Sequence, residues 1–425
     1  MKQLKFVISI GMFLLSLVLI TCDTKNNVEP TFKNYFIRYY GEDGSHEAKD
    51  FVLTNDGGVL IVGTITTGLD KRVYILKTDL EGNELWSTIL DSDINELVQD
   101  IEPIIEGIHA GKFIILTNAQ VSDNVLETRF TIINTNGVVE IRTKLQTKLL
   151  SQEGVSITSL QAGGVGGFFL TGRTTDWDSD AANANSSLPV PPEIVEDLLV
   201  VKLNQDLDTI VFNRIGGSYT GLAVRVIQLN ANSFMYCGHW DGTTDGRLPN
   251  EPKIESNLFF RAFSENPSSV ASLYAGTLSL HERLVSVARS NFGGVAIATQ
   301  SDDNGINRKV FAVSTNSDFS TVLAEGVVLG SSDEFEAVSV SSGASRFYVL
   351  ANQINAQGNR DIYFRRVDTF LQSDLDLTFG SENNDDRGAA VAELPNGDIL
   401  ILGTMELAGQ QDKIALIKVR ANGTF

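Results

Sequence analysis

Residues 50–90 decide the fold, and they read DFVLTNDGGVLIVGTITTGLDKRVYILKTDLEGNELWSTIL. The segment holds four short runs of apolar and β-branched residues: Phe51–Leu53, Val59–Gly63, Val73–Lys77 and Leu85–Leu90. The residues between the runs include the turns Asn55–Gly58 and Asp79–Asn83. Runs of this length, bounded by Asn, Asp and Gly, are typical of β-strands. The segment therefore predicts four consecutive strands.

The same unit recurs along the chain, and its second strand is the easiest to follow. Seven copies of that strand occur at Val59–Gly63, Phe113–Thr117, Gly167–Gly172, Ser233–Gly238, Gly294–Thr299, Arg346–Ala351 and Asp398–Gly403. A first strand precedes each copy and a third strand follows it, and six outer strands complete the first six units. No part of the chain after the N-terminal segment keeps a helical period. Repeats of short strands predict four-stranded sheets arranged in a ring.

The seventh unit lacks its outer strand, because the sequence stops at the turn after its third strand. A strand-like segment, Tyr35–Gly41, precedes the first unit and resembles Val211–Gly216, the outer strand of the third. We expect it to complete the last sheet and to hide an exposed edge. The fold class is therefore all-β: a single seven-bladed β-propeller of four-stranded blades over residues 31–425, closed by an N-terminal strand. Two all-β domains are the alternative, which this closing strand disfavours.

The N-terminus has the pattern of an export signal. Lys2 and Lys5 precede an apolar run, Phe6–Ile20, which is shorter than the ~20 residues of a membrane-spanning helix. The run ends in Leu19-Ile20-Thr21-Cys22, which resembles a bacterial lipobox, although Thr21 replaces the usual Gly, Ala or Ser. The resemblance implies a signal peptide over residues 1–21, lipidation of Cys22 and a polar tether over residues 22–30. An ordinary signal peptide with a chance cysteine is the alternative.

The repeat motifs also resemble a known family. Asn55–Gly63, Ile75–Asp79 and Gly82–Trp86, echoed by Leu394–Gly397 in the last unit, look like the repeat of propeller lipoproteins common in Bacteroidota. The resemblance extends over nearly the whole mature chain and is strong in two or three blades. It implies a propeller fold and a cell-envelope location, in particular the outer membrane. It implies no reaction.

The composition excludes several classes of partner and site. Lys and Arg number 33 against 53 Asp and Glu, so the formal net charge is −20, and nucleic acid is not an expected partner. The two cysteines cannot form a disulfide framework, and the four histidines are scattered without zinc-ligand spacing. We expect a monomeric propeller that meets the membrane through its lipid anchor and binds a protein or a glycan.

Two long loops carry the candidate ligand-binding residues. The loops after the second strands of blades three and four, Arg173–Asp197 and His239–Glu255, are the longest and are neighbours in the ring. Long loops in a compact repeat fold are often functional. The candidates are Trp177, Trp240, Asp176, Asp178, Asp180, Asp241 and Asp245. Their tryptophans could stack on a sugar ring while the carboxylates bind hydroxyls. In the alternative interpretation, each Trp only packs its own loop onto the blade.

The aspartates also suggest a calcium site. Asp176, Asp178 and Asp180 have the spacing of the start of a calcium loop, but Ala181 and Ser187 stand where Gly and Glu are wanted. Asp302 and Asp303 form a second, less complete candidate, which is more often a simple turn. We therefore expect no cofactor other than a possible calcium ion.

No catalytic residue stands out from the sequence. The expected function is a lipid-anchored, non-enzymatic binding or scaffold module of the cell envelope, accessory to an outer-membrane complex. The alternative is a carbohydrate-active enzyme, a glycosidase or lyase, that uses acidic residues on the loop-rich face. The sequence itself names neither ligand nor partner.

Overall fold

The computed structural model describes residues 35–123, 125–147, 151–161, 166–175, 197–215, 221–240, 258–264, 271–277, 280–302, 304–381, 383–407 and 411–425. Tyr35–Phe425 forms one compact unit. Cys22, the signal peptide and the tether lie outside the described residues. Within those residues, no helix is long and apolar enough to cross a membrane.

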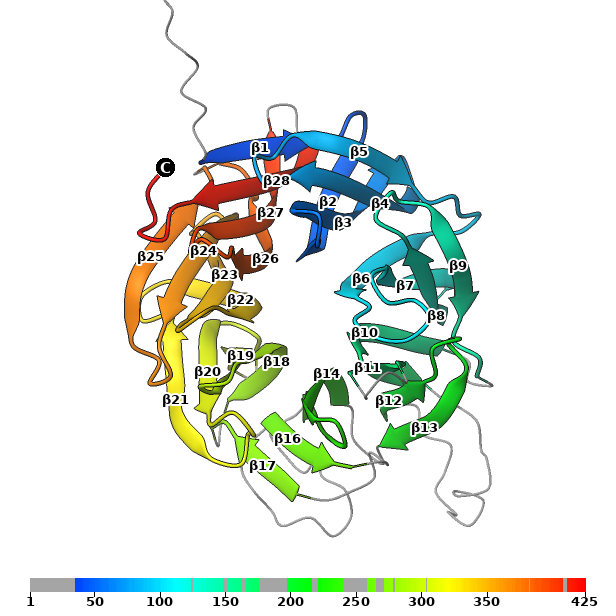
Figure 1. The fold of residues 1–425 in the computed structure, drawn as a ribbon. Helices are drawn as coiled ribbons and strands as arrows, with labels where there is room; N and C mark the ends of the chain where they lie inside the picture. The colour runs from blue at the N-terminus through cyan, green and yellow to red at the C-terminus, as the bar shows by residue number, and fades with distance from the viewer. Residues whose placement is uncertain are drawn as a thin grey trace, which may run out of the picture. The chain divides into compact units, whose positions relative to one another are not determined.

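The unit is a seven-bladed β-propeller of four-stranded antiparallel sheets, as predicted (Figure 1). The innermost strands are β2 (Ser45–Leu53), β6 (Glu96–Pro103), β10 (Ser151–Ser159), β14 (Gly221–Asn230), β18 (His281–Arg289), β22 (Glu334–Ser342) and β26 (Arg387–Glu393). The second strands are β3 (Gly58–Thr67), β7 (Phe113–Ser122), β11 (Phe168–Thr175), β15 (Ser233–Trp240), β19 (Gly294–Ser301), β23 (Phe347–Ile354) and β27 (Ile399–Leu407). The third strands are β4 (Asp70–Asp79), β8 (Val125–Ile133), β12 (Asp197–Leu203), β16 (Leu258–Phe263), β20 (Lys309–Thr315), β24 (Arg360–Val367) and β28 (Gln411–Val419). The outer strands are β5 (Glu84–Ile89), β9 (Val139–Lys144), β13 (Thr209–Ile215), β17 (Ala271–Ala275), β21 (Val322–Leu329), β25 (Ser373–Phe379) and β1 (Phe36–Tyr40).

The ring is closed by β1, which is the outer strand of the last blade. It pairs antiparallel with β28, from Phe36 opposite Lys418 to Tyr40 opposite Ile414. Side chains fasten this seam to blade one, because the Tyr40 hydroxyl donates to the Gly82 carbonyl at 2.7 Å and Lys418 Nζ donates to the Leu80 carbonyl at 3.0 Å. The predicted closure is therefore consistent with the structure.

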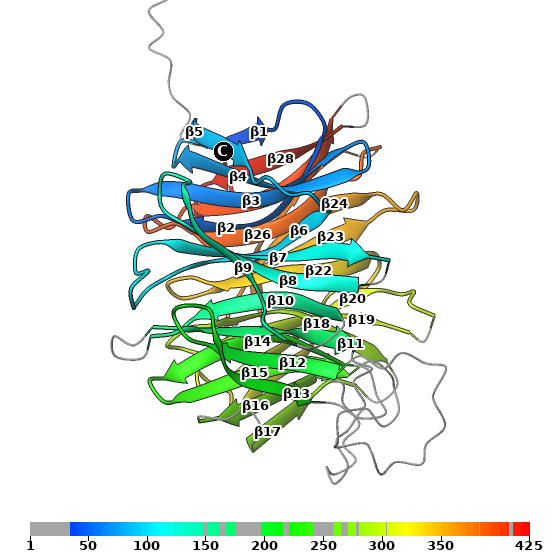
Figure 2. The ribbon, with the colours of Figure 1, turned by 90° about the vertical axis from the view of Figure 1, so that its right-hand side faces the viewer.

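The hydrophobic core lies between adjacent blades, which stack face to face around the ring (Figure 2). One cluster joins Leu76 of the first blade to Leu402 and Leu416 of the last, and similar clusters fill the other junctions. The second strand of each blade is covered on both faces, so Val59–Val62 are wholly buried. This two-sided burial explains why these strands are unbroken apolar runs instead of alternating patterns.

Every innermost strand contains a β-bulge one to three residues after its first residue. The register shifts between Ala48 and Asp50 in β2, and at the equivalent place in β6, β10, β14, β18, β22 and β26. The bulge brings the Glu47 carbonyl to 2.3 Å from where a Cβ on Gly63 would stand. The glycine that ends the repeat motif is therefore required by this close approach.

The bulges are also where neighbouring blades are joined. A bulge leaves backbone N–H groups without a ladder partner, and these need another acceptor. At five junctions a Thr or Asn side chain of the preceding blade accepts that N–H. The bonds are Ala48 to Thr404, Val98 to Thr64, Gly154 to Asn118, Ala337 to Thr299 and Gly388 to Asn352. The bulge thus fixes both the blade spacing and the side chains that face the ring centre.

Candidate functional site

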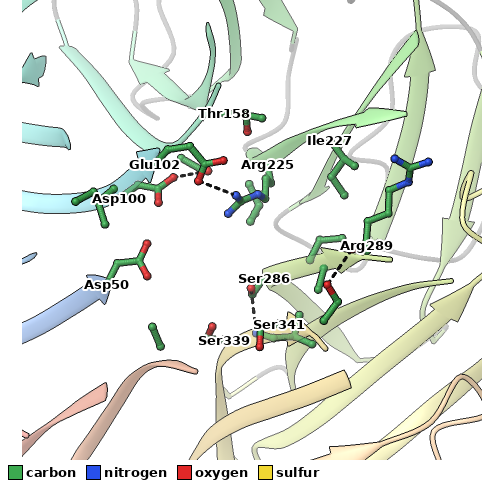
Figure 3. Close-up of a pocket in the computed structure, with 18 of the residues that line it drawn as sticks. Asp50, Asp100, Glu102, Thr158, Arg225, Ile227, Ser286, Arg289, Ser339 and Ser341 are labelled. Carbon is green, nitrogen blue, oxygen red and sulfur yellow. Dashed lines mark hydrogen bonds and ion pairs between the residues drawn. The ribbon is translucent and has the colours of Figure 1, made fainter. Parts of the chain in front are cut away.

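The innermost strands surround a central channel with a cavity of about 1070 Å³. All seven of these strands contribute side chains to its lining. The volume is at the upper end of the range of small-molecule sites, about 300 to 1000 Å³. Figure 3 shows the labelled side chains of this lining around an open centre.

The residue after each bulge occupies an equivalent position on the channel lining. Going around the ring, these residues are Asp50, Asp100, Ser156, Arg225, Ser286, Ser339 and Ala390. Two residues further along the strands, the lining residues include Glu102, Thr158, Ser341 and Ala392. We call Asp50, Asp100, Glu102 and Arg225 the charged wall, and Ser286, Ser339, Ser341, Ala390 and Ala392 the small wall.

Within the charged wall, Asp100 and Asp50 are held in place by hydrogen bonds to the strands. Asp100 Oδ2 accepts the Ser156 hydroxyl at 2.7 Å and the Ile157 N–H at 2.8 Å, so this carboxylate joins blades two and three. Asp50 Oδ1 accepts the Phe51 N–H at 2.8 Å.

Arg225 lies across blade three from Glu102. Its Nη2 is 3.4 Å from Glu102 Oε2, and among the described residues this is the one side-chain hydrogen bond of either group. A guanidinium has five N–H donors, so most of its donors face the channel unused. Water can reach the pair, because the Arg225 and Glu102 side chains keep 33% and 22% of their exposure. Behind the strand, the Cys237 thiol contacts the Arg225 carbonyl at 3.3 Å.

Burial and mutual repulsion shift the pKa values of the charged wall. Burial raises the pKa of Asp50 well above its usual value, and the charge of Asp100 raises it further. Burial also raises the pKa of Glu102, to about 7, with the Asp100 charge adding to the effect and Arg225 opposing it. The pKa of Arg225 is raised because its carboxylate neighbours outweigh its burial. One guanidinium therefore does not balance three ionised carboxylates.

A second channel arginine, Arg289, donates a hydrogen bond from each of its three side-chain nitrogens. Its Nε donates to the Ser317 carbonyl at 2.6 Å, Nη1 to Gln228 at 2.9 Å and Nη2 to Leu229 at 3.1 Å. These carbonyl oxygens tie the turns of blades four and five together. Arg289 is thus a structural residue, whereas the donors of Arg225 remain open to a ligand.

The loop residues that the sequence favoured lie largely outside the described part of the chain. This holds for Trp177, Asp176, Asp178, Asp180, Asp241 and Asp245. Trp240 is described, and it ends β15 with 5% exposure. Its ring packs against Phe259 at 5.3 Å and stands where a Cβ on Gly221 would lie. The described geometry of Trp240 is that of a core residue.

Asp302 occupies a turn. Its Oδ1 accepts the N–H groups of Asn304 and Ile306, and its Oδ2 accepts the Asn307 amide. These bonds outweigh burial and lower the pKa of Asp302. Asp303 lies outside the described residues. No group of three or more His, Cys, Asp or Glu side chains within the described ranges is arranged to hold a metal ion.

The charged wall was not among the residues predicted from sequence. The sequence does contain a signal for it. The first strands can be aligned on a small or apolar residue that stands two positions before the channel-lining residue. The aligned segments are Ala48-Lys49-Asp50, Val98-Gln99-Asp100, Ala223-Val224-Arg225, Leu284-Val285-Ser286 and Ala337-Val338-Ser339. The third position is charged in three blades and small in others. Without the bulge, that position cannot be assigned to the channel, because a one-residue shift reverses the face of a strand.

Comparison with known proteins establishes the fold alone. No known family model and no curated protein sequence matches this chain. Among solved structures, it resembles an acylaminoacyl peptidase bound to a chloromethyl ketone, with 10% identity and a TM-score of 0.51 over 88% of this chain and 52% of that one. The Pyrococcus horikoshii acylaminoacyl peptidase has 11% sequence identity and a TM-score of 0.48, over 87% of this chain and 51% of that one. The chain therefore spans about half the length of these peptidases. The polysaccharide lyase Uly1 has 9% sequence identity and a TM-score of 0.50, over 90% of this chain and 91% of that one.

Proposed function

We propose that this protein is a lipid-anchored binding module of the bacterial cell envelope, whose propeller holds a protein or glycan partner and catalyses no reaction. The observation that carries this proposal is the unequal lining of the channel. Blades five, six and seven place Ser286, Ser339 and Ala390 after the bulge, so the ring closes without charge there. Blades one, two and four place Asp50, Asp100 and Arg225 at the same position. Asp50 and Arg225 have shifted pKa values, and ionisable groups of this kind in a cavity are typical of functional sites.

The anchor and location are proposed from the sequence. Leu19–Cys22 has the form of a lipobox, and the repeats resemble those of Bacteroidota propeller lipoproteins. Replacing Cys22 with Ser should move the protein from the membrane fraction to the soluble fraction of disrupted cells, because the acyl chains of the diacylglycerol on Cys22 would supply most of the membrane affinity. Retention of Cys22→Ser in the membrane fraction would refute the anchor and leave the channel proposal standing.

Partner binding is tested by co-purification from detergent-solubilised membranes. Wild-type protein should carry a stoichiometric partner, and the double variant Asp50→Asn with Arg225→Met should lose it. Ser339→Ala is the matched control, because it changes the equivalent position of the small wall and should keep the partner. A protein that always purifies alone, or a partner retained by the double variant, contradicts a channel-based binding module.

The carbohydrate-active alternative is tested on the same material. Retaining glycosidases hold their two carboxyl groups about 5 Å apart and inverting ones further. Asp50 and Asp100 both line the channel and are the carboxyl pair that such a mechanism would use. Turnover of any member of a polysaccharide panel that is lost in Asp50→Asn would establish the enzyme instead.

A further inference from the structure

The charged wall offers two opposite charges side by side, and this suggests a ligand chemistry beyond partner binding. Arg225 and Glu102 meet through a single 3.4 Å contact. Among the described residues, the remaining Arg225 donors and Glu102 Oε1 have no protein partner. A positive group and a negative group are therefore adjacent on one surface, and both have unused hydrogen-bonding capacity.

We propose that the charged wall binds a zwitterionic small molecule in which an ammonium and a carboxylate group are neighbours, as in an α-amino acid. The carboxylate takes the free donors of Arg225, and the ammonium group lies between Glu102 and Asp50. Each ligand charge then faces an opposite charge of the wall. Charge-assisted hydrogen bonds of this kind are about twice as strong as neutral ones.

The net charge of the site favours a zwitterion over an anion. Three carboxyl groups and one guanidinium give the wall an excess of negative charge when all are ionised. An anion that reaches Arg225 also meets Asp50 and Asp100, whereas a zwitterion brings its own compensating ammonium group. The formal charge of −20 over the whole chain acts in the same direction, because it repels anions from the channel mouth.

The opposite side of the channel provides room for the rest of such a ligand. Ser286, Ser339 and Ala390 end at their Cβ or Oγ atoms, so the cavity extends away from the charged wall. Figure 3 shows Ser286, Ser339 and Ser341 below the open centre, on the side opposite Asp100 and Glu102. The ligand's side chain would therefore be held loosely, and its charged head would supply most of the binding free energy.

Binding should also release protons, because an ammonium group next to Glu102 and Asp50 favours their ionised forms. Burial and Asp100 raise the pKa of Glu102 to about 7, so this carboxyl is partly protonated near neutral pH. Titration calorimetry at pH 6.5 in phosphate and in imidazole would detect the release as a difference in binding enthalpy between the buffers. The control is Glu102→Gln, in which this part of the difference should vanish.

The decisive experiment is calorimetry on the purified full-length protein with glycine, L-alanine, L-leucine, L-lysine and L-glutamate, each up to about 10 mM, which detects Kd values near 1 mM. At least one should bind saturably. The amine and the carboxylic acid with the same carbon skeleton should each bind at least about tenfold more weakly, as should the amino acid to Arg225→Met or Glu102→Gln. Ser339→Ala should leave the affinity unchanged.

Three results would overturn the inference. Either no amino acid binds, or the amine binds as well as the amino acid, or Arg225→Met binds normally. Arg225→Lys covers the case in which Arg225→Met fails to fold, because it keeps the charge but loses the paired donors and should still weaken binding. Since these measurements use purified protein, the partner proposal can survive their failure.

Discussion

The two walls of the channel differ although the backbone beneath them is the same. On one side, the bulges of β2, β6 and β14 place Asp50, Asp100 and Arg225 towards the centre. On the other side, the bulges of β18 and β22 place Ser286 and Ser339 there. The same backbone geometry thus accepts an acid, a base or a hydroxyl group. The chemistry of the channel is therefore set by single side chains and not by the fold.

Comparing the two walls distinguishes the interactions that hold the ring together from the side chains that line the channel. Bulge N–H groups bonded to Thr or Asn, buried second strands and the β1 seam recur on both sides of the ring. At the position after the bulge, charge occurs on one side only, where it is partly desolvated, and this is costly unless another charge compensates it. The small wall therefore serves as an internal reference for every substitution in the charged wall.

The largest expected effect is that of Arg225→Met. Removing the guanidinium leaves three carboxyl groups without a cation, and the free energy of unfolding at pH 8 should fall by about 2 kcal/mol, less than for a fully buried pair because water enters the channel. At pH 5 the loss should be much smaller, since Asp50 and Glu102 then hold protons. Denaturant unfolding at both pH values measures this. An equal loss at both would show that Arg225 acts by packing.

Glu102→Gln should stabilise the protein by an amount that grows as the pH rises from about 4.5 to 7. The folded-state pKa of Glu102, about 7, lies above its unfolded value, so the folded protein binds more protons between those values. Stability therefore falls as the pH rises from about 4.5 to 7, and the uncharged Gln escapes this loss. We expect a gain of about 1.5 kcal/mol at pH 8 and none at pH 4.5.

The control for that prediction is Glu81→Gln, which removes a carboxylate from an exposed turn of blade one. It should change the free energy of unfolding by less than about 0.5 kcal/mol at either pH. If both variants behave alike, the gain comes from lowering the net charge of the whole chain. The charged wall would then have no special electrostatic cost.

The sequence predicted the ring well and the channel poorly, for one physical reason. Apolar runs such as Val59–Val62 report burial directly, so strand order, blade number and the closing segment all followed from them. The bulge after Ala48 leaves no such signature, since it depends on the close packing of Glu47 against Gly63. Whether the side chains of Asp50 and Arg225 face the channel depends on the bulge in their strands. The sequence instead favours Trp and Asp residues of the long loops, and of these Trp240 is buried.

Ser286→Ala tests whether the small wall also joins blades. The Ser286 hydroxyl oxygen accepts the Val340 N–H at 3.1 Å, in the way that Asp100 accepts the Ile157 N–H. Removing the acceptor should cost about 1 kcal/mol, because a partly buried donor loses its partner. Unlike the loss in Arg225→Met, this one should not vary between pH 5 and pH 8. A pH-dependent loss would mean that the charges of the other wall reach across the channel.

Ser339→Ala should have the smallest effect and sets the baseline. Among the described residues no hydrogen bond involves the Ser339 hydroxyl, and Ala390 already occupies the equivalent position in the next blade. The free energy of unfolding should therefore stay within about 0.5 kcal/mol of the wild-type value at any pH. A loss as large as that of Arg225→Met would reverse the comparison. The ring would then depend on its small wall, and the charges of the other wall would be the replaceable part.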